Sequence, residues 1–479
     1  MLVVTIALLA SACGSSDGSA SADETITTAP ATTETSTEST ELGTDDTADT
    51  PNTEGTASET PTEAPASANP VPDTERQPGA MDMENTLGDH AQLTTIAFDA
   101  LAFMTGNSCA DSFFPPGKVS DFFGFQYLRD NEPDGFGHNT AFAGTIGESI
   151  LNLLSEEQVG QLVDLAKTQI DDINQYGYAR LPIIDAFRRL VADTLPTGSS
   201  GLSMEAVAEY SSEIYGLDGQ ISFERAALFA DILNSLTETQ QEQLAELAAT
   251  EVAEWPGGGD STKTLKDQLE REEHVALMTY AGQMYSWYAG GIEADTYFCP
   301  ERHGTYFGSF YMKDIPAMLS QWAGTDVTIN ENLTGEYGNR FLDLLNTEQR
   351  DAIEGLVDAQ RSVMEELVET REAIATQLRR LWGELNVDQA AIESEVAALS
   401  ARYGELDGQL IALYAITFDE VYEGLTADQM ATLWSLRESA EHLGLVDDPC
   451  SQNPDDLAYL YSESIDMPEI GDTDRFFRS

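Results

Sequence analysis

Residues 346–385 read NTEQRDAIEGLVDAQRSVMEELVETREAIATQLRRLWGEL and decide the fold class. Apolar residues recur in this stretch at intervals of three and four, which is the spacing of one face of an α-helix. No proline interrupts the pattern. We therefore predict one long amphipathic helix, whose apolar positions are Ile353, Leu356, Val357, Val363, Leu367, Ile374, Leu378 and Leu381.

A second amphipathic stretch follows at residues 387–425, VDQAAIESEVAALSARYGELDGQLIALYAITFDEVYEGL. It is expected to return antiparallel to the first helix and to form a helical hairpin with it. Earlier in the chain, Pro182 is expected to kink or split the corresponding long helix, because proline has no N–H to donate. No segment alternates with period two for long enough to indicate a sheet. The predicted fold class is all-α.

The chain contains an internal repeat. Aligned without gaps, residues 90–130 and 274–314 are identical at 13 of 41 positions. The aromatic phrase FFGFQYLRD, which begins at residue 122, recurs as YFGSFYMKD at residue 306. Two tandem units related by a pseudo-twofold axis are therefore predicted, because equal units usually pack as a homodimer does. We place the units at residues 85–260 and 261–450 and a C-terminal extension at residues 451–479; matched positions include Asp111 with Asp295, Pro116 with Pro300 and Gly124 with Gly308.

One short motif occurs four times, twice in each unit. It consists of Leu, a residue that can cap a helix, two further residues and Gln. This is the pattern of a capping box, in which the cap side chain and the Gln side chain each bond to the other's main-chain N–H. The simplest interpretation is four helix starts; the motif residues are Leu154, Ser155 and Gln158; Leu236, Thr237 and Gln240; Leu345, Asn346 and Gln349; and Leu425, Thr426 and Gln429.

The four motifs also resemble the LTxxQ signature of the Spy and CpxP family of periplasmic chaperones and stress sensors. The resemblance implies an all-α cradle of long bent hairpins, with two motifs in each of two protomers. It further implies a protein that binds unfolded or partner proteins without ATP. The likeness covers the hairpins, about half of the folded body. Two features depart from the family: this body is acidic where family cradles usually have basic rims, and residues 110–130 and 294–314 have no counterpart.

The N-terminus, MLVVTIALLASAC, resembles a bacterial lipoprotein signal that ends at Cys13. Its apolar run of about ten residues is too short to span a bilayer. No Lys or Arg precedes the run, and Ala10 stands where leucine is more usual. Residues 14–84 are rich in Thr, Ser, Glu and Pro, so this segment is predicted to be a disordered tether. We expect Cys13 to be lipidated and the body to face the periplasm or the exterior of a bacterial membrane.

The net charge of −61 limits the partners. Residues 1–89 contain only 17 of the 84 acidic residues, so most of the negative charge belongs to the body. Such a body repels nucleic acid and anionic lipid. The acidity fits either a salty external medium, which screens the self-repulsion, or an ordinary secreted protein.

The repeated aromatic segments have two interpretations. They could line a binding cleft, because aromatic side chains bury a large area at a small entropic cost. More often such segments pack their own rings under a helix pair. Trp287, Tyr288, Phe298 and Tyr311 would then belong to the core.

Metal binding and catalysis are the chemical alternatives. Cys299 and His303 are four residues apart, and Cys109, His138 or His274 could complete a zinc or copper site. Two of Cys109, Cys299 and Cys450 could instead form a disulfide. His90 matches His274 across the repeat and Asp111 matches Asp295, which could suggest duplicated acid–base centres, although a histidine near a helix start is more often structural. No nucleophile elbow, phosphate-binding loop, HExxH or haem-attachment motif is present, so the chain is not expected to be an enzyme.

Overall fold

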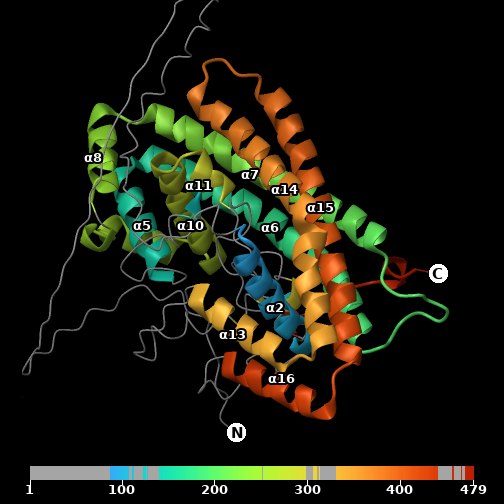
Figure 1. Cartoon of the computed structure of the whole chain (residues 1–479). Coiled ribbons are helices and arrows are strands. Elements are labelled where there is room, and N and C mark those ends of the chain that lie inside the picture. The colour runs from blue at the N-terminus through green and yellow to red at the C-terminus, as the bar shows by residue number, and fades with distance from the viewer. Residues whose placement is uncertain are drawn as a thin grey trace, which may run out of the picture. The chain divides into compact units, whose positions relative to one another are not determined.

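The computed structural model describes residues 87–106, 111–112, 122–125, 127, 140–250, 252–297, 306–309, 312, 331–440, 456–457, 465–466 and 470–478 (Figure 1). Within these ranges the chain is helical apart from its connections and a pair of two-residue strands, β1 (Asp456–Leu457) and β2 (Ile465–Asp466). The all-α prediction is therefore confirmed. No helix in the described ranges is long and apolar enough to cross a membrane.

The described helices differ widely in length, and the two hairpins contain the longest ones. The helices are α2 (Asp89–Thr105), α5 (Thr140–Leu153), α6 (Glu156–Val191), α7 (Met204–Ser235), α8 (Glu238–Ala248), α9 (Asp260–Gln268), α10 (Arg271–Ala289), α11 (Ile292–Thr296), α13 (Glu331–Leu344), α14 (Thr347–Gly383), α15 (Gln389–Glu423) and α16 (Ala427–Ala440), with 3-10 turns η1 (Val252–Glu254) and η3 (Asp474–Phe476).

The predicted hairpin at residues 346–425 is present as α14 and α15, which pack together. In the first unit α6 and α7 also pack together. The expected break at Pro182 is wrong in part, because α6 continues through this residue as a single helix. Its neighbours explain why: packing of the surrounding turns outweighs the lost hydrogen bond, since Arg180, Leu181, Ile183 and Ile184 are all buried.

The helices that begin the two aligned segments, α2 and α10, each pack on the other predicted unit. Helix α2 packs on α13, α14, α15 and α16 of the second unit, whereas α10 packs on α5 and α6 of the first (Figure 1). The contact of α2 with α13 is close enough to require a glycine, because a Cβ on Gly338 would lie 3.0 Å from the carbonyl carbon of Thr94. Each unit thus receives a core helix from the other.

The aromatic phrases follow the same exchange. Phe307 packs edge-on against Phe103 of α2, with 5.2 Å between ring centroids, and at the matched positions Phe123 packs edge-on against Trp287 of α10 at 5.8 Å. Gly124 and Gly308, which follow the two phenylalanines, have φ angles of 65° and 78° that favour glycine. Except for the half-buried Tyr127, the described residues of both phrases therefore belong to the core.

Four aromatic residues were predicted to belong to the core, and the structure describes two of them. Trp287 is fully buried and Tyr288 is partly buried against the core, which confirms the core interpretation for them. Phe298 and Tyr311 lie outside the described residues.

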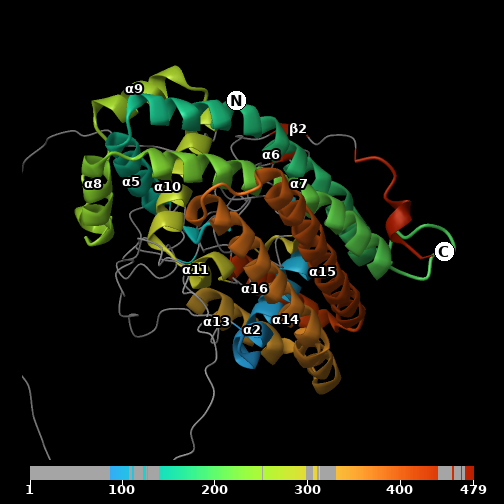
Figure 2. The same cartoon turned by 90° about the horizontal axis from the view of Figure 1, so that it is seen from above.

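Helices α7 and α15 cross in close contact between the two hairpins (Figure 2). Small residues line the crossing in antiparallel order. A Cβ on Gly404 would lie 2.5 Å from the carbonyl oxygen of Ser211, and one on Gly408 would lie 2.6 Å from Cα of Ala208. From the other side of the crossing, a Cβ on Gly219 of α7 would lie 2.6 Å from Cβ of Ser400 in α15. The pseudo-twofold relation and an origin by duplication remain predictions.

The crossing gives a test of stability with a control in the same chain. We expect Gly404→Ala to lower the free energy of unfolding by about 1–3 kcal/mol, because the main chain of α7 must move away. Gly355 lies in α14 with no atom near its missing Cβ, so Gly355→Ala should raise the free energy of unfolding by about 0.5–1 kcal/mol. Urea unfolding measures both. Equal effects of the two substitutions would contradict the close crossing.

Candidate functional site

All four sequence motifs form capping boxes. Ser155, Thr237 and Asn346 cap α6, α8 and α14, and each accepts a hydrogen bond from the main-chain N–H of the glutamine three residues later. At the start of α16 the main-chain N–H of Thr426 donates to Oε1 of Gln429 at 2.9 Å, and the main-chain N–H of Gln429 donates to Oγ1 of Thr426 at 3.3 Å. The preceding leucines are buried or packed against the core: Leu154, Leu236, Leu345 and Leu425.

The motif glutamines also join the boxes in pairs. Nε2 of Gln240 donates to Oε1 of Gln158 at 2.8 Å, and Nε2 of Gln429 donates to Oε1 of Gln349 at 2.8 Å. Each donor also reaches the last carbonyl of a third helix: Gln240 binds Leu153 of α5 at 3.1 Å, and Gln429 binds Leu344 of α13 at 2.9 Å. The fixed glutamine of the motif therefore ties two helix starts and one helix end together within each unit.

A second matched arrangement, which we call the Asp–Arg clasp, holds the exchanged helices at their C-terminal ends. In the first clasp Asp111 pairs with Nε of Arg188 at 2.9 Å, and Nη1 of Arg188 donates to the carbonyl of Gly106, the C-cap of α2, at 3.0 Å. In the second clasp Arg379 donates hydrogen bonds to both carboxylate oxygens of Asp295. Its Nη2 also donates to the carbonyl of Gly290, the C-cap of α10, at 3.0 Å.

Both clasp aspartates are fully buried, which sets their protonation. Burial raises the pKa of Asp111 to about 6, although the positive charges of Arg188, Arg437 and Arg180 act in the opposite direction. Burial likewise raises the pKa of Asp295 to about 7 against the opposing effect of Arg379 and Arg371. Raised carboxyl pKa values are common at functional sites, but structural ion pairs produce them as well. Here Arg188 and Arg379 bind the C-cap carbonyls of α2 and α10 as well as the aspartates, which favours the structural role.

The clasp arginines were missed in the sequence, although a signal was present. The repeat aligns AFRRL with QLRRL, which places Arg188 opposite Arg379, and it aligns Asp111 with Asp295. A matched acid and a matched base in a repeat are candidates for a conserved contact within each unit. Only the fold shows that the two are adjacent.

The proposed acid–base pairs are not assembled. His90 is in the first turn of α2 and is exposed, whereas Asp111 lies beyond the C-terminal end of that helix. A 17-residue helix is about 25 Å long, so the two side chains lie far apart. His274 likewise begins α10 and Asp295 follows its end, and Asp295 is engaged by Arg379. Burial also lowers the pKa of His274.

The metal hypothesis falls largely outside the described part of the chain. Cys109, Cys299, Cys450, His138 and His303 all lie there, and so does Cys13. Among the described residues no group of three or more His, Cys, Asp or Glu side chains is arranged to hold a metal ion.

The apolar faces of the long hairpins are covered by helices of the same chain. Helices α2 and α7 pack on both α14 and α15. In the described ranges only two large apolar side chains are exposed, Leu385 at 94% and Trp434 at 45%. Leu385 lies in the turn between α14 and α15, and Trp434 lies on α16. A surface that binds apolar partners is therefore expected at these positions and not along the inner face of the hairpins.

Comparisons with protein-family models, with curated proteins and with solved structures find no match for this chain. The resemblance to the Spy and CpxP family thus depends on the motif alone.

The buried carboxyls give a pH prediction. Burial, together with the charges of Glu423, Asp193 and Glu420, raises the pKa of the half-buried Asp419 to about 7. A carboxyl whose pKa is higher in the folded than in the unfolded state stabilises the protein below the unfolded pKa, and this stabilisation is lost as pH rises through the folded value. Stability should therefore increase when pH falls from 8 to 6.

Thermal unfolding of two variants measures the contributions. Asp419→Asn should raise the free energy of unfolding at pH 8 by on the order of 1 kcal/mol, since solvent screens part of the effect, and should flatten the pH profile. Asp295→Ala removes both oxygens that Arg379 binds, whether or not the carboxyl is protonated, and should instead destabilise the protein at pH 8 by about 3–5 kcal/mol. A wild-type profile that is flat between pH 6 and 8 would contradict the prediction.

Proposed function

We propose that this chain is a lipid-anchored bacterial surface protein whose helical body binds unfolded or partner proteins without nucleotide. The observation that carries the proposal is the end of the α14–α15 hairpin. Leu385 is almost fully exposed there, beside the partly buried Trp382 and Val387. These three residues are called the hairpin tip below. The fourfold motif resemblance to extracytoplasmic chaperones supports the same class of function.

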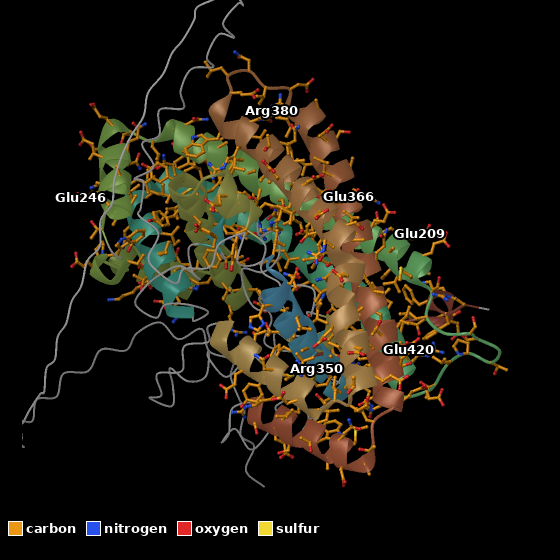
Figure 3. The ribbon with its side chains drawn as sticks, viewed as in Figure 1. Glu209, Glu246, Arg350, Glu366, Arg380 and Glu420 are labelled. Atoms are coloured by element: carbon orange, nitrogen blue, oxygen red, sulfur yellow. The ribbon has the colours of Figure 1, made fainter. Side chains whose placement is uncertain are left out.

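The surroundings of the hairpin tip favour basic partners. Glu384, Asp388 and Glu393 are exposed close to Leu385 in the sequence, although Glu384 is paired with Arg380. Exposed acidic side chains also project from helices elsewhere in the body, including Glu366, Glu246 and Glu420 (Figure 3). Contact with one or a few apolar side chains is shallow, so binding should be weak and tolerant of partner sequence. Salt should weaken it further, because the charged groups are exposed.

The alternatives have less support. A zinc or copper site would depend on Cys299 and His303, for which the structure describes no contact. An enzyme would need the His–Asp pairs together, and the described helices hold them apart. Protein binding is the function that uses exposed features of the described surface.

The anchoring part of the proposal depends on Cys13. We expect Cys13→Ser to move the protein from the membrane fraction to the soluble fraction, because the lipid attached to this cysteine is the apolar anchor that the sequence predicts. Fractionation followed by immunoblotting measures the change. Cys450→Ser, which removes another cysteine, is the control and should stay with the membrane. Retention of the Cys13→Ser variant would refute the lipoprotein assignment.

The binding part can be tested with residues 14–479. At several-fold molar excess this chain should slow the aggregation of a reduced basic client, measured by light scattering at low and high salt. Leu385→Asp should require about tenfold more protein for the same protection, because burial of one leucine contributes about 1.5–3 kcal/mol.

Ala390→Asp is the matched control, because Ala390 is exposed near the start of α15 and the substitution adds the same charge without removing a large apolar side chain. It should protect like the wild type. Unchanged aggregation in the presence of the wild-type chain would contradict the proposed function, and equal loss in both variants would contradict the role of the hairpin tip.

A further inference from the structure

The last described residues, 470–478, lie along the end of the α6–α7 hairpin (Figure 1). We call them the C-terminal segment. Its main chain pairs with the loop before α7 as a short strand would. The N–H of Ser203 donates to the carbonyl of Phe476 at 2.7 Å, and the N–H of Arg478 donates to the carbonyl of Gly201 at 2.8 Å. An antiparallel bridge between Leu202 and Phe477 joins these bonds.

Aromatic side chains fill the space between the segment and α7. Phe476 is fully buried, and its ring packs edge-on against Tyr210 with 5.4 Å between centroids. The guanidinium of Arg475 stacks over the Tyr210 ring at 4.3 Å, a favourable cation–π distance. Leu202 and Phe477 are also buried. The segment is therefore held by its side chains as well as by its main chain.

Polar contacts fix the register of the segment on α6. Nη2 of Arg189 binds Oδ1 of Asp474 at 2.8 Å, and Nη1 of Arg189 donates to Oγ1 of Thr473 at 2.7 Å. The hydroxyl of Thr473 donates to Oδ2 of Asp185 at 2.6 Å. Arg189 also stacks over the ring of Phe477 at 4.9 Å. Arg189 thus contacts both an acidic residue, Asp474, and an aromatic residue, Phe477, of the segment.

Together these contacts have the features of a peptide-recognition site. Main-chain pairing supplies affinity, and pockets for particular side chains supply specificity. The contacts described above all come from α6, α7 and the loop between them, in the first unit, although the segment follows the second unit in the sequence. Residues 441–469, which are 29 residues, separate it from the end of α16.

We propose that the end of the α6–α7 hairpin is a peptide-binding groove for an acidic–basic–aromatic–aromatic segment, and that the C-terminal segment of a second copy of this chain can occupy it. The segment contains its recognition elements within nine residues, so the same contacts form whichever copy supplies it. A connection of this length gives the chain's own segment a millimolar effective concentration on order of magnitude. Exchange between copies therefore requires a weakened segment or a high local concentration, as on a membrane. The proposal does not depend on client binding.

Two complementary full-length variants test the exchange. Phe476→Ala weakens the segment and leaves the groove open, whereas Arg189→Glu with Leu202→Glu disables the groove and leaves the segment intact. Each variant alone should sediment as a monomer. An equimolar mixture at about 100 µM should form a one-to-one complex, because the Phe476→Ala chain supplies an open groove and the double variant supplies an intact segment. A mixture that stays monomeric, with both variants showing wild-type helicity, would overturn the proposal.

A peptide measurement tests recognition separately. A labelled peptide of residues 470–479 should bind the Phe476→Ala chain saturably, as measured by fluorescence anisotropy. A Phe476→Ala peptide should bind at least about 100-fold more weakly, because truncation of a buried phenylalanine is costly. An Arg478→Ala peptide should bind normally, because Arg478 is exposed and its contacts here are those of the main chain.

If the Phe476→Ala chain does not fold, a chain with both Arg475→Ala and Asp474→Asn replaces it as the receptor. These two substitutions weaken the contacts of the segment while Phe476 stays in place, and the peptide titration is repeated on that chain. The absence of saturable binding by a millimolar peptide to a folded receptor chain, or equal binding of all three peptides, would show that the segment is only a fixed terminus.

Discussion

The buried ion pair of each Asp–Arg clasp is the interaction on which the arrangement of the helices depends. Asp111 and Asp295 lie just beyond the ends of α2 and α10, and the arginines that hold them come from α6 and α14. Removing two charges from water costs about as much as their attraction returns, so such a pair adds little net stability. Its effect is geometric. We infer that the clasps fix where each exchanged helix ends, and so allow α2 and α10 to leave their own unit and pack in the other.

The exchange joins the two predicted units into one compact body. The described residues from 87 to 478 belong to one compact unit, in contrast to the two separate domains that a tandem repeat first suggests. Neither half of the sequence has a complete core of its own, because α2 packs on the second hairpin and α10 on the first. The C-terminal segment adds a further connection from the end of the chain back to α6 and α7. Loss of one clasp is therefore expected to disturb both halves.

Local features of the fold could be predicted from the sequence, and long-range features could not. The periodicity of residues 346–385 and the box of Asn346 and Gln349 predicted α14 and its first residue closely. These signals are local, because a helix face and a cap involve neighbouring residues. Pro182 was over-interpreted, since burial of α6 around it outweighs the local penalty. The exchange of α2 and α10 and the crossing at Gly404 and Gly408 depend on contacts between distant segments, which periodicity does not encode. The motif glutamines were recognised, but their pairing across two helices was not.

The distribution of charge links the interior of the protein to its surroundings. The chain has only 23 basic residues against 84 acidic ones, yet Arg180, Arg225, Arg371 and Arg437 are almost fully buried. Arginine suits this position because its planar group serves several acceptors and stacks on rings, as Arg180 does over Tyr306 at 4.8 Å and Arg371 does over Phe122 at 4.9 Å. Cations placed in the core cannot neutralise the surface. The exposed faces of the helices are therefore left strongly acidic, and we expect the body to repel anionic lipid and nucleic acid and to favour partners that carry positive charge.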